Sequence, residues 1–188
     1  HPSGTDATIG KCARGGGIHT ESGTDVTITD SIISDTVVVA AYDASRGGGV
    51  FLGSTTTAPS SLTVSGTTIS GNSAEGDGPS GALGGGVGTE YCSVVTIDDS
   101  VVEDNSVTAS AARAFGAGLA INFCDSVTVN RTTVRGNSNY VSAAGVGAYG
   151  GGVYLSSVTT TTLTSSTFSD NEVVHAGTLN GNPLCLAA

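Results

Sequence analysis

Two acidic residues of this chain are each followed, 32 positions later, by an arginine: Asp99 by Arg131 and Glu103 by Arg135. A carboxylate beside an arginine base is the arrangement that a calcium-assisted polysaccharide lyase needs, and a pair of carboxylates would suit a glycoside hydrolase. The alternative is two ion pairs on a solvated face. We favour the ion pairs, because each carboxylate already has a cationic partner and the sequence shows no aromatic platform for a sugar.

Other candidate chemical groups do not form a site. Residues 145–150 match the dinucleotide-binding fingerprint by letter, but that motif needs a strand before it and a helix after it. His19 and His175 lie at opposite ends of the chain, and His1 is terminal. We therefore expect no catalytic residue, no cofactor and no bound metal. Calcium at an acidic group remains an open alternative, with these candidate ligands: Asp98, Asp99 and Asp104.

The interval of 32 residues is one unit of a repeat that occurs five times between residues 15 and 171. Each copy has an apolar residue after a glycine-rich run, namely Ile18, Val50, Val87, Leu119 and Val153. Each then has an apolar strand centre, namely Ile28, Val64, Ile97, Val129 and Leu163. Five residues beyond each centre stands another apolar residue, namely Ile33, Ile69, Val102, Val134 and Phe168. A repeat of 32 to 37 residues indicates a solenoid.

The pieces inside each copy are typical of β-strands. Residues 26–29 and 127–130 alternate apolar with polar side chains, as expected of a strand with one face in a core. We predict an all-β parallel solenoid of about five rungs with three short strands in each rung. A single domain then spans residues 1–188, with an N-terminal segment at 1–14 and a C-terminal tail at 172–188.

The run Gly-Gly-Gly-Val and the segment from Leu62 to Ala74 (LTVSGTTISGNSA) resemble the right-handed parallel β-helix repeats of bacterial secreted and surface proteins. They are also similar to the repeats of chlamydial polymorphic outer-membrane proteins. The resemblance covers residues 15–171 and implies a right-handed helix in an extracellular setting. Adhesins, matrix proteins and carbohydrate enzymes share this scaffold, so the resemblance does not imply one function.

Stacking of the repeats predicts which side chains meet. Cys92 and Cys124 each lie five residues after the leading apolar residue of their copies, so their backbones should lie about 4.8 Å apart. That separation is within the range of about 4.4 to 6.8 Å that a disulfide needs, and we expect this bond. The same register places Asp99 beside Arg131 and Glu103 beside Arg135.

A column of amides is expected inside the solenoid. Eight residues beyond the strand centres stand Thr36, Asn72, Asn105, Asn137 and Asn171. Stacked asparagines satisfy each other's hydrogen bonds, so we predict an internal ladder that Thr36 ends on the first rung.

The remaining cysteines lie at opposite ends of the stack. Cys12 precedes the first rung and Cys185 follows the last, so five rungs would hold them roughly 20 Å apart. Head-to-tail docking of two subunits would pair the free strand edges and bring these cysteines together. The hypothesis is a filament locked by an intermolecular disulfide. The alternative is a monomer whose tail folds back.

The connections after each amide position vary in length, which predicts that they lie outside the ladder on one side. They are residues 37–46, 73–83, 106–115 and 138–149. Because they are rich in valine and alanine, we expect them either to fold over the solenoid as an extra layer or to face a partner. The extra layer is favoured, since monomers rarely expose large apolar patches.

Composition narrows the setting. The chain has 188 residues, 29 glycines, no methionine and a net charge of −10. We expect His1 to be a processed end of an exported protein, found in the extracellular space or at the cell surface. No apolar run is long enough to span a bilayer, and the acidic surface argues against nucleic acid or anionic membrane as a partner. The partners expected are a second copy, glycans or cell surfaces.

Three functions fit this pattern. We favour a non-catalytic structural or adhesive solenoid, and a carbohydrate-active enzyme is the alternative. Ice binding is a third, because flat threonine arrays suit it and one outward column is threonine throughout: Thr27, Thr63, Thr96, Thr128 and Thr162. The charge of Asp98 in the neighbouring column argues against it.

Overall fold

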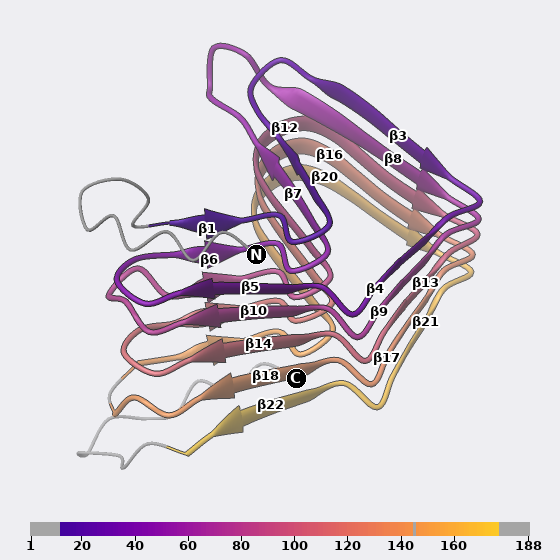
Figure 1. Ribbon diagram of the computed structural model, residues 1–188. Helices are drawn as coiled ribbons and strands as arrows, with labels where there is room; N and C mark the ends of the chain where they lie inside the picture. Colours follow the sequence, from indigo (N-terminus) through magenta and orange to yellow (C-terminus); the bar gives the residue numbers. More distant parts are fainter. Residues whose placement is uncertain (1–11, 145, 177–188) are drawn as a thin grey trace.

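The structure is a computed structural model that describes residues 12–144 and 146–176, and within these residues every regular element is a β-strand (Figure 1). The strands form four parallel sheets, which we name after their first strands. The chain passes through all four sheets once per rung, and it completes five rungs.

The strand bounds follow the repeat closely. The β1 sheet contains β1 (Ala13–Arg14), β6 (Ser45–Arg46), β11 (Ala82–Leu83), β15 (Ala114–Phe115) and β19 (Ala148–Tyr149). The β2 sheet contains β2 (Ile18–Thr20), β3 (Asp25–Thr29), β7 (Val50–Gly53), β8 (Ser60–Ser65), β12 (Val87–Asp98), β16 (Leu119–Asn130) and β20 (Val153–Thr164). The β4 sheet contains β4 (Ile32–Ser34), β9 (Thr68–Ser70), β13 (Val101–Glu103), β17 (Thr133–Arg135) and β21 (Thr167–Ser169). The β5 sheet contains β5 (Val37–Ala40), β10 (Ser73–Gly76), β14 (Ser106–Ala109), β18 (Ser138–Val141) and β22 (Glu172–His175).

The cross-section of the solenoid has two parts, which Figure 1 shows end-on. A triangular part is enclosed by the two halves of the β2 sheet and by the β4 sheet. A flat arm extends from it, in which the β1 sheet lies over the β5 sheet. The triangular part holds the larger apolar core, built from Val, Leu and Ile columns and the cysteines 92 and 124. The arm holds a separate core made mainly of alanines.

The register of the rungs is the one that the sequence repeat predicts. Ile97 of β12 pairs with Val64 of β8 and with Val129 of β16, and Val129 pairs in turn with Leu163 of β20. These centres are buried in the inner rungs, with Val64 and Ile97 fully enclosed. The expected fold class, an all-β parallel solenoid of about five rungs, is therefore confirmed.

Two expectations about the rung need correction. The first is the number of strands, because each rung has four or five strands rather than three. The second is that the connections lie outside the ladder. Val37–Ala40 and its equivalents instead form the in-register β5 sheet, and Ser45–Arg46 and its equivalents form the β1 sheet. Their inward alanines pack against one another, so they are part of the solenoid rather than a layer placed over it.

The glycine runs lie where consecutive rungs approach most closely. A Cβ atom on Gly49 would lie 2.7 Å from the carbonyl oxygen of Gly86, and one on Gly86 would lie 2.7 Å from the carbonyl oxygen of Gly118. Any larger residue would push the rungs apart, which accounts for glycine at this position of the repeat.

An amide ladder runs through the interior, where Asn72, Asn105 and Asn137 are fully buried. Asn72 Nδ2 donates to Asn105 Oδ1 at 3.0 Å, Asn105 Nδ2 donates to Asn137 Oδ1 at 3.0 Å, and Asn137 Nδ2 donates to Asn171 Oδ1 at 2.9 Å. Thr36 ends the column by donating to Asn72 Oδ1 at 2.7 Å.

A second polar ladder, which sequence reasoning missed, lies at the corner between the β2 and β4 sheets. At this corner the side-chain hydroxyl of each of the last four rungs accepts a hydrogen bond from the main-chain N–H of the equivalent residue in the preceding rung. The column is Ser31, Thr67, Ser100, Thr132 and Ser166. A hydroxyl residue three positions beyond each strand centre was the signal available in the sequence.

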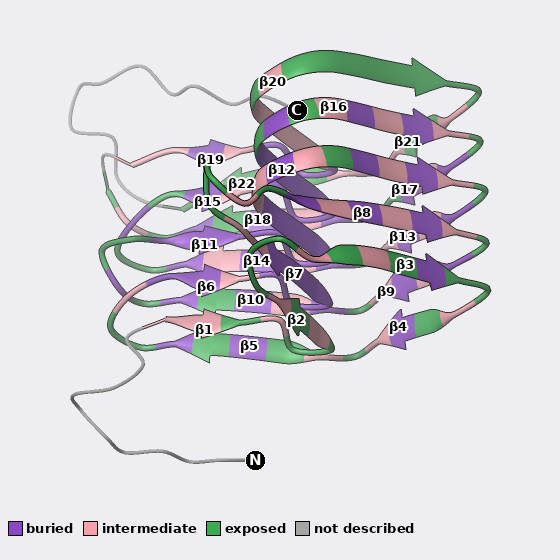
Figure 2. Ribbon diagram, turned by 90° about the horizontal axis from the view of Figure 1, so that it is seen from above, coloured by how far each residue is buried: buried purple, intermediate pink, exposed green. Residues whose placement is uncertain are grey.

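No strand among the described residues pairs with the outer side of the last rung. Leu163 is 48% exposed and Phe168 is 41% exposed, whereas their equivalents one rung earlier, Val129 and Val134, are 1% and 0% exposed. Figure 2 shows β20 exposed over most of its length, in contrast to β16 and β12. The parallel strand pairing of the solenoid also continues past residue 171, because β22 pairs with β18. The sequence had placed the start of the tail at Glu172, which this pairing corrects.

Candidate binding site at a stacked aromatic pair

The arginines singled out in the sequence form ion pairs with the acidic residues of the preceding rung. Arg131 Nε donates to Asp99 Oδ1 at 2.7 Å and Arg131 Nη2 donates to Asp99 Oδ2 at 2.8 Å, which makes a bidentate pair. Arg131 Nη2 also lies 2.6 Å from Asp98 Oδ2. Arg135 Nε donates to Glu103 Oε2 at 2.7 Å. Both arginines are about half exposed, so these are surface pairs.

The charge states follow from this pairing. The hydrogen bonds from Arg131 hold the pKa of Asp99 below its usual value, and the same bonds raise the pKa of Arg131. The hydrogen bond to Glu103 likewise raises the pKa of Arg135. A general base needs a pKa near the working pH, and pairing moves both arginines away from that range.

The acidic group proposed as a calcium site has two of its members bound to one guanidinium, since Asp98 and Asp99 both contact Arg131. Among residues 12–144 and 146–176, no group of three or more His, Cys, Asp or Glu side chains is placed to hold a metal ion. His19 lies in the first rung and His175 in the last.

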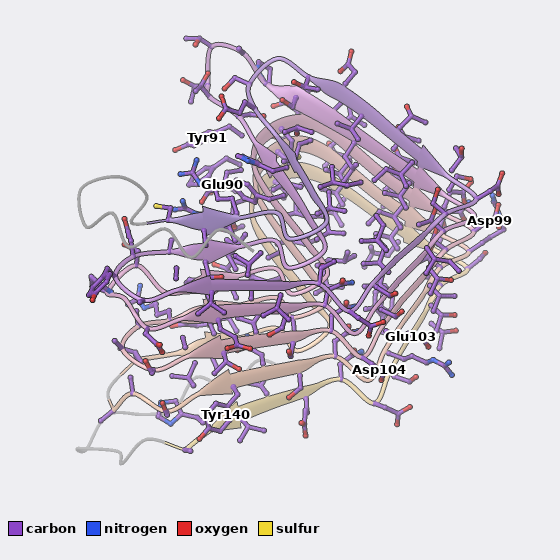
Figure 3. The ribbon with its side chains drawn as sticks, in the orientation of Figure 1. Glu90, Tyr91, Asp99, Glu103, Asp104 and Tyr140 are labelled. Atoms are coloured by element: carbon purple, nitrogen blue, oxygen red, sulfur yellow. A yellow bond between two sulfur atoms is a disulfide. The ribbon has the colours of Figure 1, made fainter. Side chains whose placement is uncertain are left out.

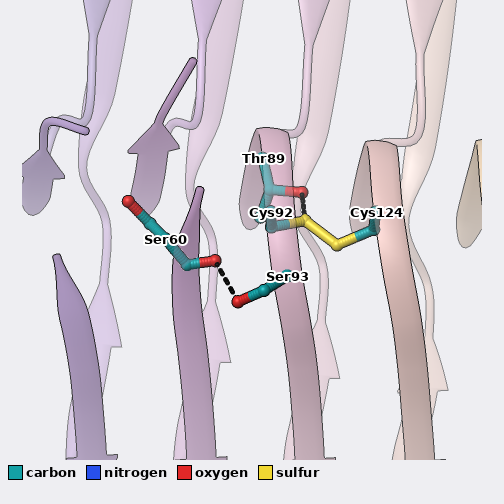
Figure 4. The surroundings of a disulfide bond; sticks show 5 residues. All are labelled: Ser60, Thr89, Cys92, Ser93 and Cys124. Carbon is teal, nitrogen blue, oxygen red and sulfur yellow. Dashed lines mark hydrogen bonds between the residues drawn. A yellow bond between two sulfur atoms is a disulfide. The ribbon is translucent and has the colours of Figure 1, made fainter. Parts of the chain in front are cut away.

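Cys92 and Cys124 form a disulfide that joins β12 to β16, with their Cα atoms 4.6 Å apart (Figure 4). Both cysteines are 2% exposed and belong to the core of the triangular part. The hydroxyl of Thr89 lies 3.3 Å from Cys92 Sγ, and Ser93 Oγ donates to the carbonyl oxygen of Ser60 at 3.2 Å. These contacts fix the backbone on each side of Cys92.

Directly before each cysteine stands an aromatic residue that points outward. Tyr91 and Phe123 stack on each other with ring centroids 4.8 Å apart and an interplanar angle of 11°. Phe123 is 48% exposed, and neither ring belongs to an apolar core cluster. A stacked pair, in which Phe123 is exposed and Tyr91 is half-buried, is therefore held on two rungs that the disulfide ties together.

The backbone at these rings has an unusual conformation that repeats from rung to rung. Tyr91, Phe123 and Ser157 have φ angles of 58°, 55° and 54°, in the left-handed region. Bulky residues rarely adopt it, and such strain costs about 1–3 kcal/mol per residue. The conformation turns each side chain outward between two halves of a long strand. The preceding rung has the loop 54–59 at this place, because Gly53 aligns with Glu90 and Ser60 with Cys92.

A pocket of about 320 Å³ surrounds the pair. Its lining residues are Thr55, Thr56, Pro59, Tyr91, Cys92, Phe123, Cys124, Asp125, Ser157 and Thr159. Since Tyr91 belongs to the third rung and Phe123 to the fourth, the outer face of Tyr91 points toward loop 54–59 and the outer face of Phe123 points toward Ser157. The pocket is an open depression whose lining combines two aromatic rings with a few hydroxyl groups and one carboxylate.

The residues that directly precede the two rings in the sequence, Glu90 and Asn122, form a neighbouring column of polar side chains. Glu90 forms an ion pair with Arg46 at 3.3 Å, and Figure 3 shows Glu90 and Tyr91 on the same side of the solenoid. Asn122, which precedes Phe123, is 9% exposed, and its Oδ1 has no hydrogen-bond partner among the described residues.

A second aromatic group has a packing role. Phe115 and Tyr149 stack with centroids 5.3 Å apart, and Tyr154 tilts against Phe115 at 4.9 Å. They lie in the angle between the β1 sheet and the first half of the β2 sheet, where Phe115 packs against a buried cluster that contains Phe51. These rings extend an apolar contact inside the molecule.

The sequence analysis identified no aromatic platform, whereas the structure shows Tyr91 and Phe123 stacked on each other. Tyr91, Phe123 and Ser157 stand four residues beyond the leading apolar residues of their copies, so a comparison of equivalent positions would have placed the two rings together.

The other predicted residues lie elsewhere. The threonine column is in register through all five rungs, and Asp98 in the neighbouring column accepts from Asn130 Nδ2 at 2.9 Å. Cys12 donates to Asp43 Oδ2 at 3.3 Å, and hydrogen bonds from Ser80 and Cys12 lower the pKa of Asp43. Cys185 lies outside the described residues, so its pairing stays a prediction. Within the part of the chain that is described, no helix is long and apolar enough to cross a membrane.

Comparison with known proteins agrees with this architecture. The family model described as "Right handed beta helix region" matches residues 3–183. No curated protein and no solved structure matches the chain.

Proposed function

Because the chain belongs to the right-handed β-helix family, whose scaffold serves both enzymes and structural proteins, we propose that its own surface makes it a non-catalytic binding module. It acts as an adhesive solenoid of the extracellular space or cell surface. The observation that carries this proposal is the stacked Tyr91–Phe123 pair in its pocket, with Phe123 exposed and the disulfide next to it.

The placement of the charged groups supports a binding role over a catalytic one. Figure 3 shows Tyr91 and Asp99 on opposite sides of the solenoid. The carboxylates with the best spacing for chemistry are therefore remote from the pocket, and Arg131 and Arg135 are engaged with them. Asp125 is the acidic residue in the lining of the pocket, and a glycosidase would need a pair of carboxylates that flank the bound sugar.

The disulfide supports an extracellular setting, since such bonds persist in oxidising compartments. The resemblance of the repeats to those of bacterial secreted and surface proteins points the same way. An acidic chain with a net charge of −10 is also suited to partners other than nucleic acid.

The test is to incubate the protein with insoluble polysaccharides and fixed cells, and to measure both retention and turnover. We expect retention without release of new reducing ends or unsaturated products. Arg131→Gln and Arg135→Gln variants should be retained as well as the wild type. Turnover that these variants or Glu103→Gln abolish would contradict the proposal and favour the carbohydrate-active enzyme.

A second role, end-to-end assembly, is favoured by the exposed apolar side chains of the last described rung. Leu163 and Phe168 line a hollow of about 380 Å³ together with the glycine run 150–152. Free strand edges invite pairing with another chain, and the first rung of a second copy is a matching parallel edge. We propose that copies dock head to tail there, with a bond from Cys185 to Cys12 of the next copy.

Electron microscopy and non-reducing electrophoresis test this assembly together. Filaments and a ladder of multimers that collapses on reduction would support it. Single particles and a monomer band with an internal bond between Cys12 and Cys185 would show that the chain closes on itself.

A further inference from the structure

The aromatic stack occupies two of three equivalent positions that share one backbone conformation. The three equivalent positions Tyr91, Phe123 and Ser157 share the same left-handed backbone, which directs all three side chains outward. Two of them carry rings whose centroids lie 4.8 Å apart, close to the spacing between rungs. At the third position a serine leaves the space of one ring empty, above the outer face of Phe123.

Resting on the proposed binding function, we propose that this space is a stacking slot for a pyranose ring of a neutral saccharide. The ring would lie flat on Phe123 at the level of Ser157 and continue the stack as its third member. A pyranose is a flat ring with apolar C–H groups on its faces and hydroxyl groups around its edge. The ring of Phe123 can pack against the apolar C–H groups of the sugar. The side chains of Ser157, Thr159 and Asp125, which line the same pocket, can form hydrogen bonds with its hydroxyl groups.

The rim determines the class of saccharide. Asp125 is exposed within the pocket and Glu90 lies in the column next to the rings, whereas Arg46 of the β1 sheet is already paired with Glu90. A carboxylate accepts hydrogen bonds from sugar hydroxyls but repels an anionic sugar. The slot therefore favours hexoses and pentoses without uronate, sulfate or phosphate groups.

The cost of building the slot also indicates a ligand. Holding two aromatic residues at φ angles of 58° and 55° costs about 1–3 kcal/mol each, and Phe123 remains 48% exposed. The disulfide ties the third rung to the fourth, and the Ser93–Ser60 hydrogen bond ties the third rung to the second, which reduces the ordering cost of binding.

The partly exposed carboxylate of Glu90 extends the site toward the arm. A carboxylate accepts hydrogen bonds from sugar hydroxyls. A second sugar unit that continues from the slot toward the β1 sheet would pass Glu90. Oligosaccharides should therefore bind more tightly than monosaccharides.

Two variants test the slot from opposite directions, with calorimetry and saturation-transfer NMR on soluble hexamers of glucose, xylose and mannose as probes. Phe123→Ala removes the platform and should weaken binding at least about tenfold, as expected for a central aromatic anchor. Ser157→Phe fills the slot with the third ring and should abolish binding while the protein stays folded, because Tyr91 and Phe123 show that this backbone accepts an aromatic residue.

Tyr140→Ala is the matched control, since Tyr140 is an exposed aromatic residue on the β5 sheet and should leave binding unchanged. Far-UV circular dichroism verifies the fold of every variant. Absence of binding by all three hexamers, or binding that Ser157→Phe leaves intact, overturns the slot. Retention on cells without any hexamer binding would remove the slot but keep the proposed adhesion. Cleavage of a bound hexamer would keep the slot but remove the non-catalytic function.

Discussion

Asn105 is the residue whose replacement tests the internal amide ladder most directly. It is fully buried in the third rung and makes four hydrogen bonds through its side chain. Its Nδ2 donates to Asn137 Oδ1 and to the carbonyl oxygen of Ile69, both at 3.0 Å. Its Oδ1 accepts from the main-chain N–H and from Nδ2 of Asn72, again at 3.0 Å.

Substitution of Asn105 by leucine removes all four bonds and leaves the buried N–H of Asn72 without an acceptor. An orphaned buried donor costs about 1–3 kcal/mol, and each of the other lost bonds contributes about 1 kcal/mol. The added apolar carbons recover part of this, so the free energy of unfolding should fall by about 3–5 kcal/mol. Asn171→Leu should cost only about 1 kcal/mol, because Asn171 lies half-buried in the open last rung, where water can replace the amide.

Urea unfolding followed by far-UV circular dichroism measures these differences, and Asn130→Leu is the matched control. Asn130 also lies in a column that repeats from rung to rung, but its side chain faces outward. Its amide forms hydrogen bonds with Asp98 and Thr164 at the surface. The expected order of destabilisation is Asn105 first, then Asn171, then Asn130. If all three variants unfold at the same urea concentration, the ladder contributes nothing and the reasoning is refuted.

Three further predictions concern other features. Replacement of Cys92 and Cys124 by alanine should lower the free energy of unfolding by about 2–4 kcal/mol, and a urea midpoint equal to that of the oxidised wild type would argue against a structural bond. The pKa of Asp99 is lower in the folded protein than in the unfolded chain, so its pair with Arg131 stabilises the protein above the unfolded pKa of about 4. The difference in free energy of unfolding between the wild type and Arg131→Gln should therefore shrink as the pH falls below that value. A difference that stays constant down to pH 2 would contradict this. A thermal hysteresis assay should find none, because Asp98 and its bonds to Arg131 interrupt the flat threonine face, whereas measurable hysteresis would favour ice binding.

The large apolar columns and the disulfide could be predicted from the sequence, because the five copies of the repeat can stack with their apolar residues buried in only one register. The apolar landmarks are Val, Ile, Leu and Phe, whose spacing repeats in five copies, and any slip would bury polar residues. The sheets of the arm could not be predicted in the same way. Their inward residues are mainly alanines, such as Ala74, Ala82 and Ala114, and so small a side chain gives little contrast between the two faces of a strand.

The candidate site was missed for a different physical reason. Tyr91 and Phe123 face outward only because their backbone takes the left-handed conformation, which interrupts the strand alternation. A strand pattern read by alternation assigns each ring to the same face as the residue two positions earlier. The conformation that creates the platform is not visible in residue type, since bulky residues rarely adopt it.

The disulfide between neighbouring rungs has a mechanical consequence. When a solenoid is pulled from its two ends, the outer rungs peel away one at a time, because each rung is held only by its neighbours. Cys92 and Cys124 are 32 residues apart in sequence, and a fully extended chain spans about 3.3–3.6 Å per residue. The bond therefore withholds roughly 110 Å of contour length from the extending chain. Under tension the protein would thus yield at its ends while the two rungs that carry the aromatic pair remain joined.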